Sequence, residues 1–207
     1  MSAAEKTKQD NSISKKLLSK ELYYDFKFPD TVFRRVVKDD IPEIISLHDV
    51  LFPVKYSDSF FNSLIRRDDM HTILAFSVED GVLTGVSTAR IEEKSESCYA
   101  IREGYISTLG VKPGYRRHGL GKFLLEKTVE LLEKQQSCSA IKLHVKADNI
   151  PAINLYYKTG FELLEHLVNH YYFDGKRHDA LHLVRYVRPP PPRVKKDPGL
   201  FDRCTIL

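Results

Sequence analysis

The stretch "RRHGLGKFLLEKTVELLEK", residues 116–134, decides the fold, because it joins a basic, glycine-containing turn directly to a helical pattern. It follows the strand-like run "YISTLGV", so the turn connects a strand to a helix. The first backbone N–H groups of a helix lack intrahelical partners, and the helix dipole favours an anion beside them. Gly119 and Gly121 let a ligand approach this backbone without meeting a Cβ atom. With Arg116 and Arg117, the turn predicts a pyrophosphate cradle.

The spacing of this turn sets it apart from two common phosphate-binding motifs. It lacks the Lys-Ser/Thr of a P-loop, and it has the pattern Arg-x-x-Gly-x-Gly rather than Gly-x-Gly-x-x-Gly. Taken alone, the turn would fit a basic surface turn with a glycine cap about equally well. The order of the surrounding elements therefore has to decide its role.

Strand and helix patterns alternate from Thr31 to Val187 and predict one α/β domain. The predicted strands cover 31–37, 71–78, 82–93, 99–111, 140–145, 161–173 and 180–187, and the predicted helices cover 39–52, 57–67, 119–136 and 149–159. This order predicts a mixed central sheet of about seven strands with about four helices. Asp39 or Asp40 is expected to cap the first helix, and Asn149 the last.

Composition divides the chain into three parts and limits its class. With 207 residues and 42% hydrophobic content, the chain suits one core. Residues 1–30 form a polar, Lys-rich extension, 31–187 the domain, and 188–207 a Pro-rich basic tail. No apolar run reaches the ~18 residues of a membrane span, and nothing resembles a signal peptide, so we expect a cytosolic chain. The three cysteines have no metal-ligand spacing, so neither a disulfide framework nor a metal site is predicted.

The net charge of +4 is concentrated near the C-terminus. Residues 185–203 hold six Lys or Arg and two Asp side chains, which leaves the rest of the chain neutral. A neutral body argues against a groove that follows a phosphate backbone, so no nucleic-acid partner is expected.

Several ordered motifs resemble the GNAT superfamily of acetyl-CoA-dependent N-acetyltransferases. Arg116, Gly119 and Gly121 match its motif Gln/Arg-x-x-Gly-x-Gly/Ala, and the element order agrees. The stretches "LFPVKYSDSFF", "YISTLGVKPGYRRHGLG", "IKLHV" and "NIPAINLYYKTGFE" are similar to N-terminal acetyltransferases of the NatE catalytic-subunit and NatF types, over roughly residues 31–187. The resemblance implies a GNAT fold and transfer of an acetyl group from acetyl-CoA to the α-amine of protein N-termini by direct attack.

The resemblance also implies which residues do the chemistry. Tyr105 and His144 match the catalytic positions, where they would remove a proton from an ammonium whose ordinary pKa is ~8. Acetyl-CoA is expected to be held by Leu109, Gly110, Val111, Arg116, Arg117, His118, Gly119, Leu120, Gly121, Asn149 and Tyr156. The substrate peptide, with methionine as its first residue, is expected to contact Phe52, Pro53, Val54, Tyr56, Tyr171 and Tyr172. Tyr157, beside Tyr156, is interpreted as a packing residue.

Two alternatives stay open beside this interpretation. One is a non-catalytic subunit that keeps the acetyl-CoA fold, and the other is a lysine or histone acetyltransferase. A ribosome or a NatA-type complex is a possible partner of the N-terminal acetyltransferase types.

The last four residues, Cys204-Thr205-Ile206-Leu207, form a C-a-a-X box. A terminal leucine is the usual signal for geranylgeranyl transfer to the cysteine. The basic residues upstream would attract the chain to an anionic membrane surface. We therefore expect a peripheral enzyme on the cytoplasmic face of a membrane, and the NatF resemblance makes the Golgi the expected one.

Overall fold

The computed structural model describes residues 23–96 and 99–187. The predictions for Cys204 and the C-terminal tail, and for most of the N-terminal extension, concern residues outside these ranges. No helix among the described residues is long and apolar enough to cross a bilayer.

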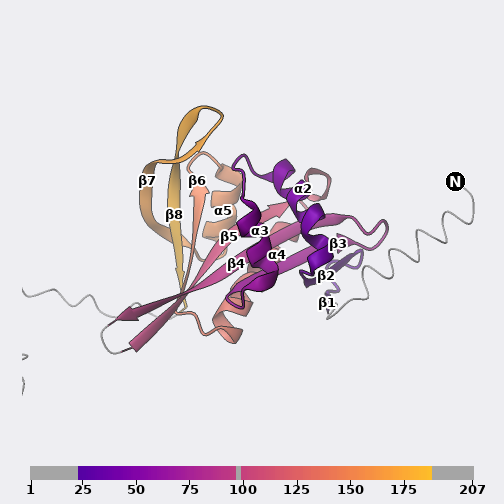
Figure 1. Cartoon of the computed structure of the whole chain (residues 1–207), viewed down its shortest axis with the longest axis horizontal. Helices are drawn as coiled ribbons and strands as arrows, with labels where there is room; N and C mark the ends of the chain where they lie inside the picture. Colours follow the sequence, from indigo (N-terminus) through magenta and orange to yellow (C-terminus); the bar gives the residue numbers. More distant parts are fainter. Residues whose placement is uncertain (1–22, 97–98, 188–207) are drawn as a thin grey trace, which may run out of the picture.

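The described residues form one eight-stranded sheet with the order β1-β2-β3-β4-β5-β6-β8-β7 (Figure 1). Its strands are β1 Tyr23–Tyr24, β2 Thr31–Arg35, β3 Met70–Ser77, β4 Leu83–Glu96, β5 Tyr99–Val111, β6 Ala140–Lys146, β7 Glu162–Phe173 and β8 Lys176–Tyr186. Only the β5–β6 pair is parallel, so the predicted mixed sheet is confirmed. β1, which pairs with β2, lies within the segment that the sequence assigned to the extension. A two-residue strand has no periodicity by which to predict it.

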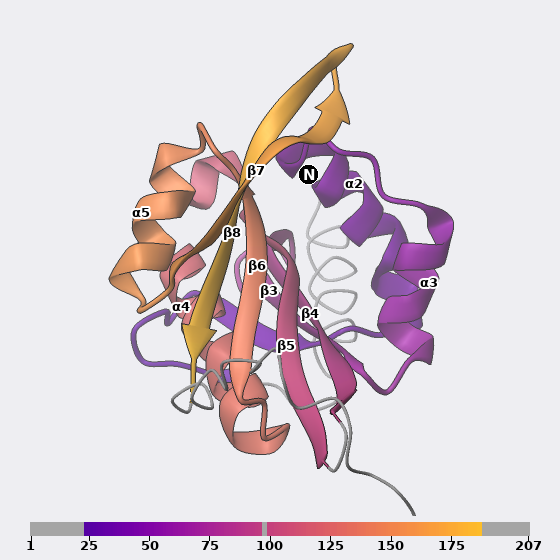
Figure 2. The same cartoon turned by 90° about the vertical axis from the view of Figure 1, so that its left-hand side faces the viewer.

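Within the described residues, four α-helices cover the two faces of the sheet. They are α2 Ile41–Leu51, α3 Asp58–Arg66, α4 Leu120–Glu130 and α5 Ile150–Lys158. α2 and α3 lie on one face, and α4 and α5 on the other (Figure 2). Short turns, η1 Lys38–Asp40 and η2 Pro113–Tyr115, precede α2 and α4, and the π-helical turn η3 Leu131–Gln135 continues α4 to its predicted end. The domain is therefore an α/β structure of three layers.

The buried face of α4 joins the two halves of the sheet. Near its start, Phe123 and Leu124 pack with Phe33 and Ala75 of β2 and β3. Further along, Val129 belongs to a second cluster that includes residues of β6, α5 and β8. A third cluster, on the opposite face, packs α2 and α3 against the sheet. Because one helix contributes to cores on both sides of the β5–β6 junction, its N-terminus is held in a fixed place.

The predicted caps have different outcomes. Asn149 caps α5, since its side chain accepts a hydrogen bond from the Ala152 amide at 3.4 Å. Asp40 occupies the N-cap position of α2 but makes no side-chain cap bond. Its carboxylate instead accepts two hydrogen bonds, both of 2.6 Å, from the buried Arg34 guanidinium. The prediction that Asp39 or Asp40 is the N-cap is therefore confirmed for the position of Asp40, but its carboxylate binds Arg34 rather than the first-turn amides, because a buried guanidinium is the stronger partner.

The parallel ladder between β5 and β6 is short, and beyond it the two strands separate. The ladder runs only from Glu103 opposite Ala140 to Ile106 opposite Leu143. At the same place the β4–β5 register shifts, so that Ser107 is an extra residue on β5. Such a bulge bends its strand, and β5 then diverges from β6. The two strands therefore separate shortly before the turn that leads into α4.

Candidate active site

A cleft of about 560 Å³ lies where β5 and β6 separate. Most of the residues predicted for the site line it: Phe52, Pro53, Val54, Tyr56, Leu109, Gly110, Val111, Arg116, Arg117, Gly121, His144, Asn149, Tyr156 and Tyr171. These residues come from the α2–α3 loop, β5, the turn before α4, β6, α5 and β7. The structure therefore brings together segments that are far apart in the sequence.

The turn before α4 has the conformation that an anion cradle needs. Gly119 is the N-cap of α4 and has a φ of +87°, in the left-handed region that favours glycine. The Arg116 Nε donates a hydrogen bond to the Val111 carbonyl at 2.8 Å, which fixes the turn against β5. A Cβ atom on Gly121 would come no closer than 3.6 Å to any other heavy atom of the chain. The packing of the fold would therefore tolerate a side chain at Gly121, and the space beside this glycine is left for a ligand.

Three predicted members of the cradle, His118, Gly119 and Leu120, do not line the cleft. The His118 side chain is exposed. The Leu120 side chain is buried against Phe123 and its neighbours. Their side chains are therefore not placed at the ligand, because the first turn of a helix directs only some of its residues toward one side. Their backbone groups still belong to the helix N-terminus.

Gly110 is required by close packing. A Cβ atom at this position would lie 2.5 Å from Leu51 Cδ1 and 3.1 Å from the Phe52 ring. The end of α2 and the start of the following loop therefore rest directly on the cofactor strand. The sequence left open a bulge, a close approach by a ligand or a simple strand end at Gly110. The bulge lies at Ser107 instead.

Tyr105 and His144 form a hydrogen-bonded pair at the cleft. The Tyr105 hydroxyl lies 2.7 Å from His144 Nδ1. The Arg90 guanidinium stacks over the Tyr105 ring, 3.9 Å from its centroid. His144 lines the cleft, and both rings are half-buried. The structure therefore places the two predicted catalytic residues in contact.

The protonation states of this pair suit a proton acceptor. Burial raises the pKa of Tyr105, with a smaller opposing effect of Arg90, so the phenol stays protonated. Burial, followed by the nearby His182, His170 and Arg90, lowers the pKa of His144 to about 4. A lowered histidine pKa means that the imidazole is neutral at any pH above that value. In the tautomer that carries hydrogen on Nε2, the Tyr105 hydroxyl donates to Nδ1.

Tyrosines from three elements enclose the cleft between the two sheet halves. Burial is the main cause that raises the pKa of Tyr56 to about 12 and raises the pKa values of Tyr156 and Tyr171. Their hydroxyls are thus hydrogen-bond donors at neutral pH. Tyr172 is 69% exposed and does not line the cleft, so its assignment to the substrate site stays a prediction. Successive residues of a strand point to opposite faces, and only Tyr171 faces inward.

Tyr157 also differs from its prediction. The sequence assigned it to packing, but its side chain is 43% exposed. Its neighbour Tyr156 is buried and lines the cleft. The two positions are one residue apart on α5, so they face different directions.

Sequence reasoning missed some residues of the site. Arg90, on β4, stacks over the face of the Tyr105 ring. Phe173, two residues after Tyr171, also lines the cleft. The period-2 alternation of β7 could have found Phe173. No sequence signal marks Arg90, since its role depends on strand pairing.

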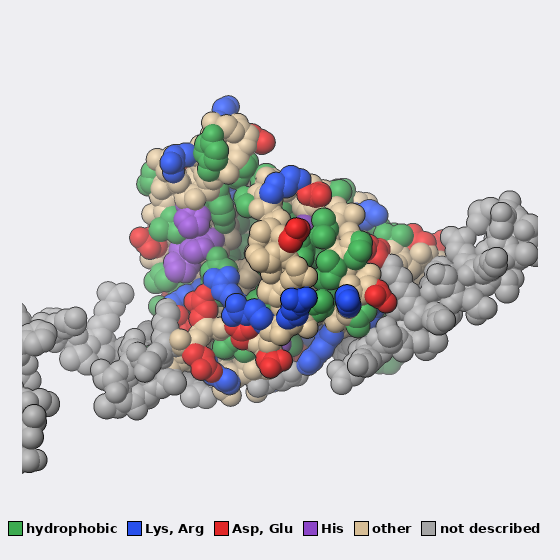
Figure 3. Space-filling model, viewed as in Figure 1, with side chains coloured by type: hydrophobic (Ala, Val, Ile, Leu, Met, Phe, Trp, Pro, Cys, Tyr) green, Lys and Arg blue, Asp and Glu red, His purple; other side chains and the backbone are tan. Residues whose placement is uncertain are grey.

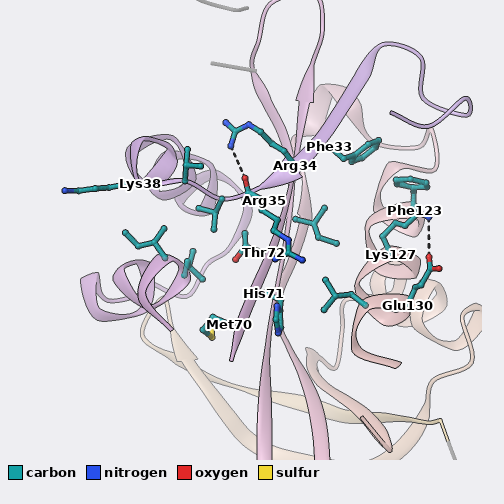
Figure 4. A pocket seen from close by; sticks show the side chains of 16 residues that line it. Phe33, Arg34, Arg35, Lys38, Met70, His71, Thr72, Phe123, Lys127 and Glu130 are labelled. Carbon is teal, nitrogen blue, oxygen red and sulfur yellow. Dashed lines mark hydrogen bonds and ion pairs between the residues drawn. The ribbon is translucent and has the colours of Figure 1, made fainter. Parts of the chain in front are cut away.

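A second, larger cavity of about 810 Å³ lies at the β2 side of the domain (Figure 4). Arg34, Arg35, His71, Thr72 and Lys127 are among the residues that line it. It contains none of the predicted site residues. Size alone therefore does not identify the reactive cleft. Among the described residues, no group of three His, Cys, Asp or Glu side chains could hold a metal ion.

The divergent strands, the Arg-x-x-Gly-x-Gly helix start and the Tyr105–His144 pair define a GNAT-type acetyltransferase site. The profile of the acetyltransferase (GNAT) family matches residues 41–161, and the chain belongs to this family. It is an acetyltransferase that uses acetyl-CoA.

Within the family, the chain is similar to N-terminal acetyltransferases. It is 30% identical to N-alpha-acetyltransferase 50 of Danio rerio over 136 residues, which cover 66% of this chain and 77% of the relative. NAA60 of Arabidopsis thaliana in complex with a bisubstrate analogue superposes with a TM-score of 0.70 and 27% identity, covering 76% of this chain and 99% of that chain. Naa50 of Arabidopsis thaliana, in complex with the bisubstrate analogue CoA-Ac-MVNAL, has a TM-score of 0.65 and 30% identity, with 75% and 98% coverage.

Removing either member of the catalytic pair is expected to slow acetyl transfer. Tyr105→Phe and His144→Ala should each lower kcat by roughly 10- to 10⁴-fold, because general-base assistance is lost. Acetyl-CoA affinity should change much less. Initial rates and acetyl-CoA titrations measure the two effects, with Tyr157→Phe and His166→Ala as controls on exposed residues. Wild-type rates in both catalytic variants would remove the pair from the mechanism.

The glycine at the helix start is expected to serve the ligand rather than the fold. Gly121→Ala should weaken acetyl-CoA binding about tenfold, a loss of ~1.4 kcal/mol, because its Cβ atom takes the room left for the ligand. The thermal midpoint should not change, since the nearest atom is 3.6 Å away. Calorimetric titration and thermal unfolding separate the two effects. Gly114→Ala is the matched control, because a Cβ atom there meets nothing within 4 Å. Equal affinities for the two variants would contradict the cradle.

Proposed function

We propose that this chain acetylates the α-amine of protein N-termini that begin with methionine. The observation that carries the proposal is the wall of the cleft beside His144. There the apolar α2–α3 loop, with Phe52, Pro53 and Val54, faces Tyr171 of β7 across a common cavity. Burying an apolar side chain stabilises its complex by ~0.8 kcal/mol for each CH₂ group. A methionine side chain fits such a wall, and its α-amine then lies near the catalytic pair.

The first step of the proposed reaction is removal of a proton from the substrate ammonium. Tyr105 and His144 form a hydrogen-bonded path, so a proton taken at the tyrosine hydroxyl is matched by one passed to His144 Nδ1. The pKa of His144, about 4, makes it a neutral acceptor that gives up its proton readily to solvent. The free amine then attacks the acetyl carbonyl carbon, and a C–N bond forms.

The backbone of β5 and a tyrosine of α5 support the remaining steps. Beyond Ile106, β5 has no ladder with β6, so the amides of Leu109 and Val111, which alternate with those that face β4, are the donors proposed to bind the pantetheine and the thioester. Fixed backbone donors stabilise the negative oxygen of a tetrahedral intermediate. When the C–S bond breaks, the buried Tyr156 is the hydroxyl placed to donate to the thiolate. Its raised pKa keeps the phenol protonated for that role.

The shape of the cleft argues against the alternative substrates. Tyr56 and Tyr171 both line the cleft and both help to enclose it. A covered slot accepts a chain terminus more easily than a lysine within a folded surface. A non-catalytic binding subunit would have no need for the Tyr105–His144 pair.

A peptide panel tests the substrate assignment. Peptides that start with Met, followed by an uncharged residue or Lys, should be acetylated on the α-amine, because the apolar loop rewards burial of the thioether side chain. Mass spectrometry of the products locates the acetyl group. An N-terminally blocked peptide with an internal lysine is the matched control. Faster turnover of Ser- or Ala-starting peptides, or of the blocked peptide, would contradict the assignment.

We also propose that the enzyme works at the cytoplasmic face of a membrane, held by a prenyl group on Cys204. One lipid chain seldom anchors a protein stably, and a second signal is normally needed. Arg193, Lys195, Lys196 and Arg203 supply that signal, each with on the order of 1 kcal/mol against an anionic leaflet. The prolines at 189–192 favour an extended spacer, which would hold the domain off the surface. The NatF resemblance points to the Golgi.

Fractionation of cells tests the anchor. The wild type should be found with membranes, whereas Cys204→Ser should be soluble, because the cysteine sulfur carries the lipid. The mass of the wild-type chain should include the prenyl group. Equal solubility of the two proteins, or an unmodified Cys204 in cells, would rule out the anchor. Leu207→Ser provides a second variant, since a terminal serine directs a different prenyl group and should retain membrane binding.

A further inference from the structure

Histidine side chains gather on the face of the molecule that carries β6, β7 and β8 (Figure 3). Two of them touch the catalytic imidazole. The His182 ring centroid lies 4.3 Å from that of His144, and the His170 centroid lies 4.7 Å from it. The catalytic role of His144 needs neither neighbour for its hydrogen bond to Tyr105.

The sheet register fixes this arrangement. His144 on β6 stands directly opposite His182 on β8 in an antiparallel ladder. Side chains of such a pair share one face, and like charges directly opposite each other are destabilising. His170 reaches the same ring from β7, just past the left-handed Asn169, whose φ is 56°. Three strands therefore contribute to one stack of imidazoles.

We propose that His182 and His170 are positioning residues that orient the His144 imidazole and keep it unprotonated for its work with Tyr105. This inference rests on the proposed function of His144 as a proton acceptor. The two neighbours act through His144, and neither needs to touch the substrate.

The three rings differ in burial. His170 is exposed and His182 is partly exposed, whereas His144 lines the cleft. A charge on either flanking ring would lie directly beside the catalytic imidazole. Once either ring is charged, its repulsion opposes a second proton on His144. The acceptor then stays neutral over a wider range of pH than an isolated histidine would.

Other charged groups near the stack act in both directions. Facing His144 from β4 are Arg90, which opposes its protonation, and Glu92, which favours it less strongly. On its own strand, Lys142 and Lys146 flank it, and they are paired with Glu103 and Asp148.

The surroundings of His182 are similarly mixed. Lys142 and His170 oppose its protonation, whereas Glu165 and Glu103 favour it.

Histidine-selective NMR on the full-length protein tests the proposal. The His144 signal is assigned with His144→Gln, and its pKa is followed in His182→Gln and in the double variant His170→Gln/His182→Gln. The pKa of His144 should rise by about one unit in the double variant, because nearby positive charge is lost. His182→Lys, which keeps a positive charge, should hold the pKa at its wild-type value. The control is His166→Gln, an exposed histidine paired with Asp179.

The outcomes separate positioning from mere packing. An unchanged His144 pKa in the double variant overturns the proposal. An equal rise in His182→Gln and His182→Lys also overturns it, because ring packing alone would then explain the effect. Since His170 is exposed, His170→Gln alone should give a rise of the same sign even if replacements at 182 fail to fold.

A rate profile adds a readout of function. The acid limb of kcat for a Met-starting peptide should move to higher pH in the double variant and not in His166→Gln. If the acid limb of the kcat profile does not move although the His144 pKa rises, the link between the imidazole stack and catalysis is overturned. If no peptide amine is acetylated by the wild type, the proposed function fails, whereas the NMR titration still decides whether the flanking rings control His144.

Discussion

The short parallel ladder between β5 and β6 is the constraint on which the rest of the structure depends. Pairing ends at Ile106 and Leu143, and every component of the cleft lies around the opening that follows. Backbone amides that would otherwise pair within the sheet are left for a ligand. Leaving such buried groups without a hydrogen-bond partner costs free energy, so a ligand that pairs with them is favoured. Tyr105 lies within this ladder and His144 directly follows its last pair, so the catalytic pair stands at the point where the strands separate. Ligand recognition and proton transfer thus share one cause.

The helix α4 turns this opening into a defined site. Its buried side chains belong to clusters on both sides of the ladder, so it holds two diverging half-sheets in one orientation. Its N-terminus points its unpaired amides at the same opening, where Gly119 and Gly121 keep the backbone accessible. A helix that packs across a gap in a sheet supplies both the rigidity and the positive end of a dipole. The positive electrostatic potential of the cradle therefore comes from a helix that the fold already needs for its packing.

Much of this architecture could be predicted from the sequence, because its signals are local. Turn residues such as Asp174-Gly175, both with positive φ, and the cap at Asn149 marked element boundaries closely. The inward and outward positions of β7 were harder to predict, because a one-residue uncertainty reverses the face of a strand. The N-cap position of Asp40 was predicted, but its ion pair was not, because its partner, Arg34, lies on a different element. Arg90 and the flanking histidines depend on which strands become neighbours, and no local pattern encodes that.

The contact between Gly110 and Leu51 has a consequence for how such an enzyme can change over time. The α2–α3 loop that forms the apolar wall rests on the strand that carries the cofactor amides, without space for even a methyl group between them. Reshaping the wall for a different first residue would press on that strand. New specificity is therefore more accessible through Tyr171 and the β7–β8 hairpin, which face the cleft from the opposite side. The two walls therefore differ in their freedom to diversify, and on β7 that freedom excludes His170, whose ring lies against His144.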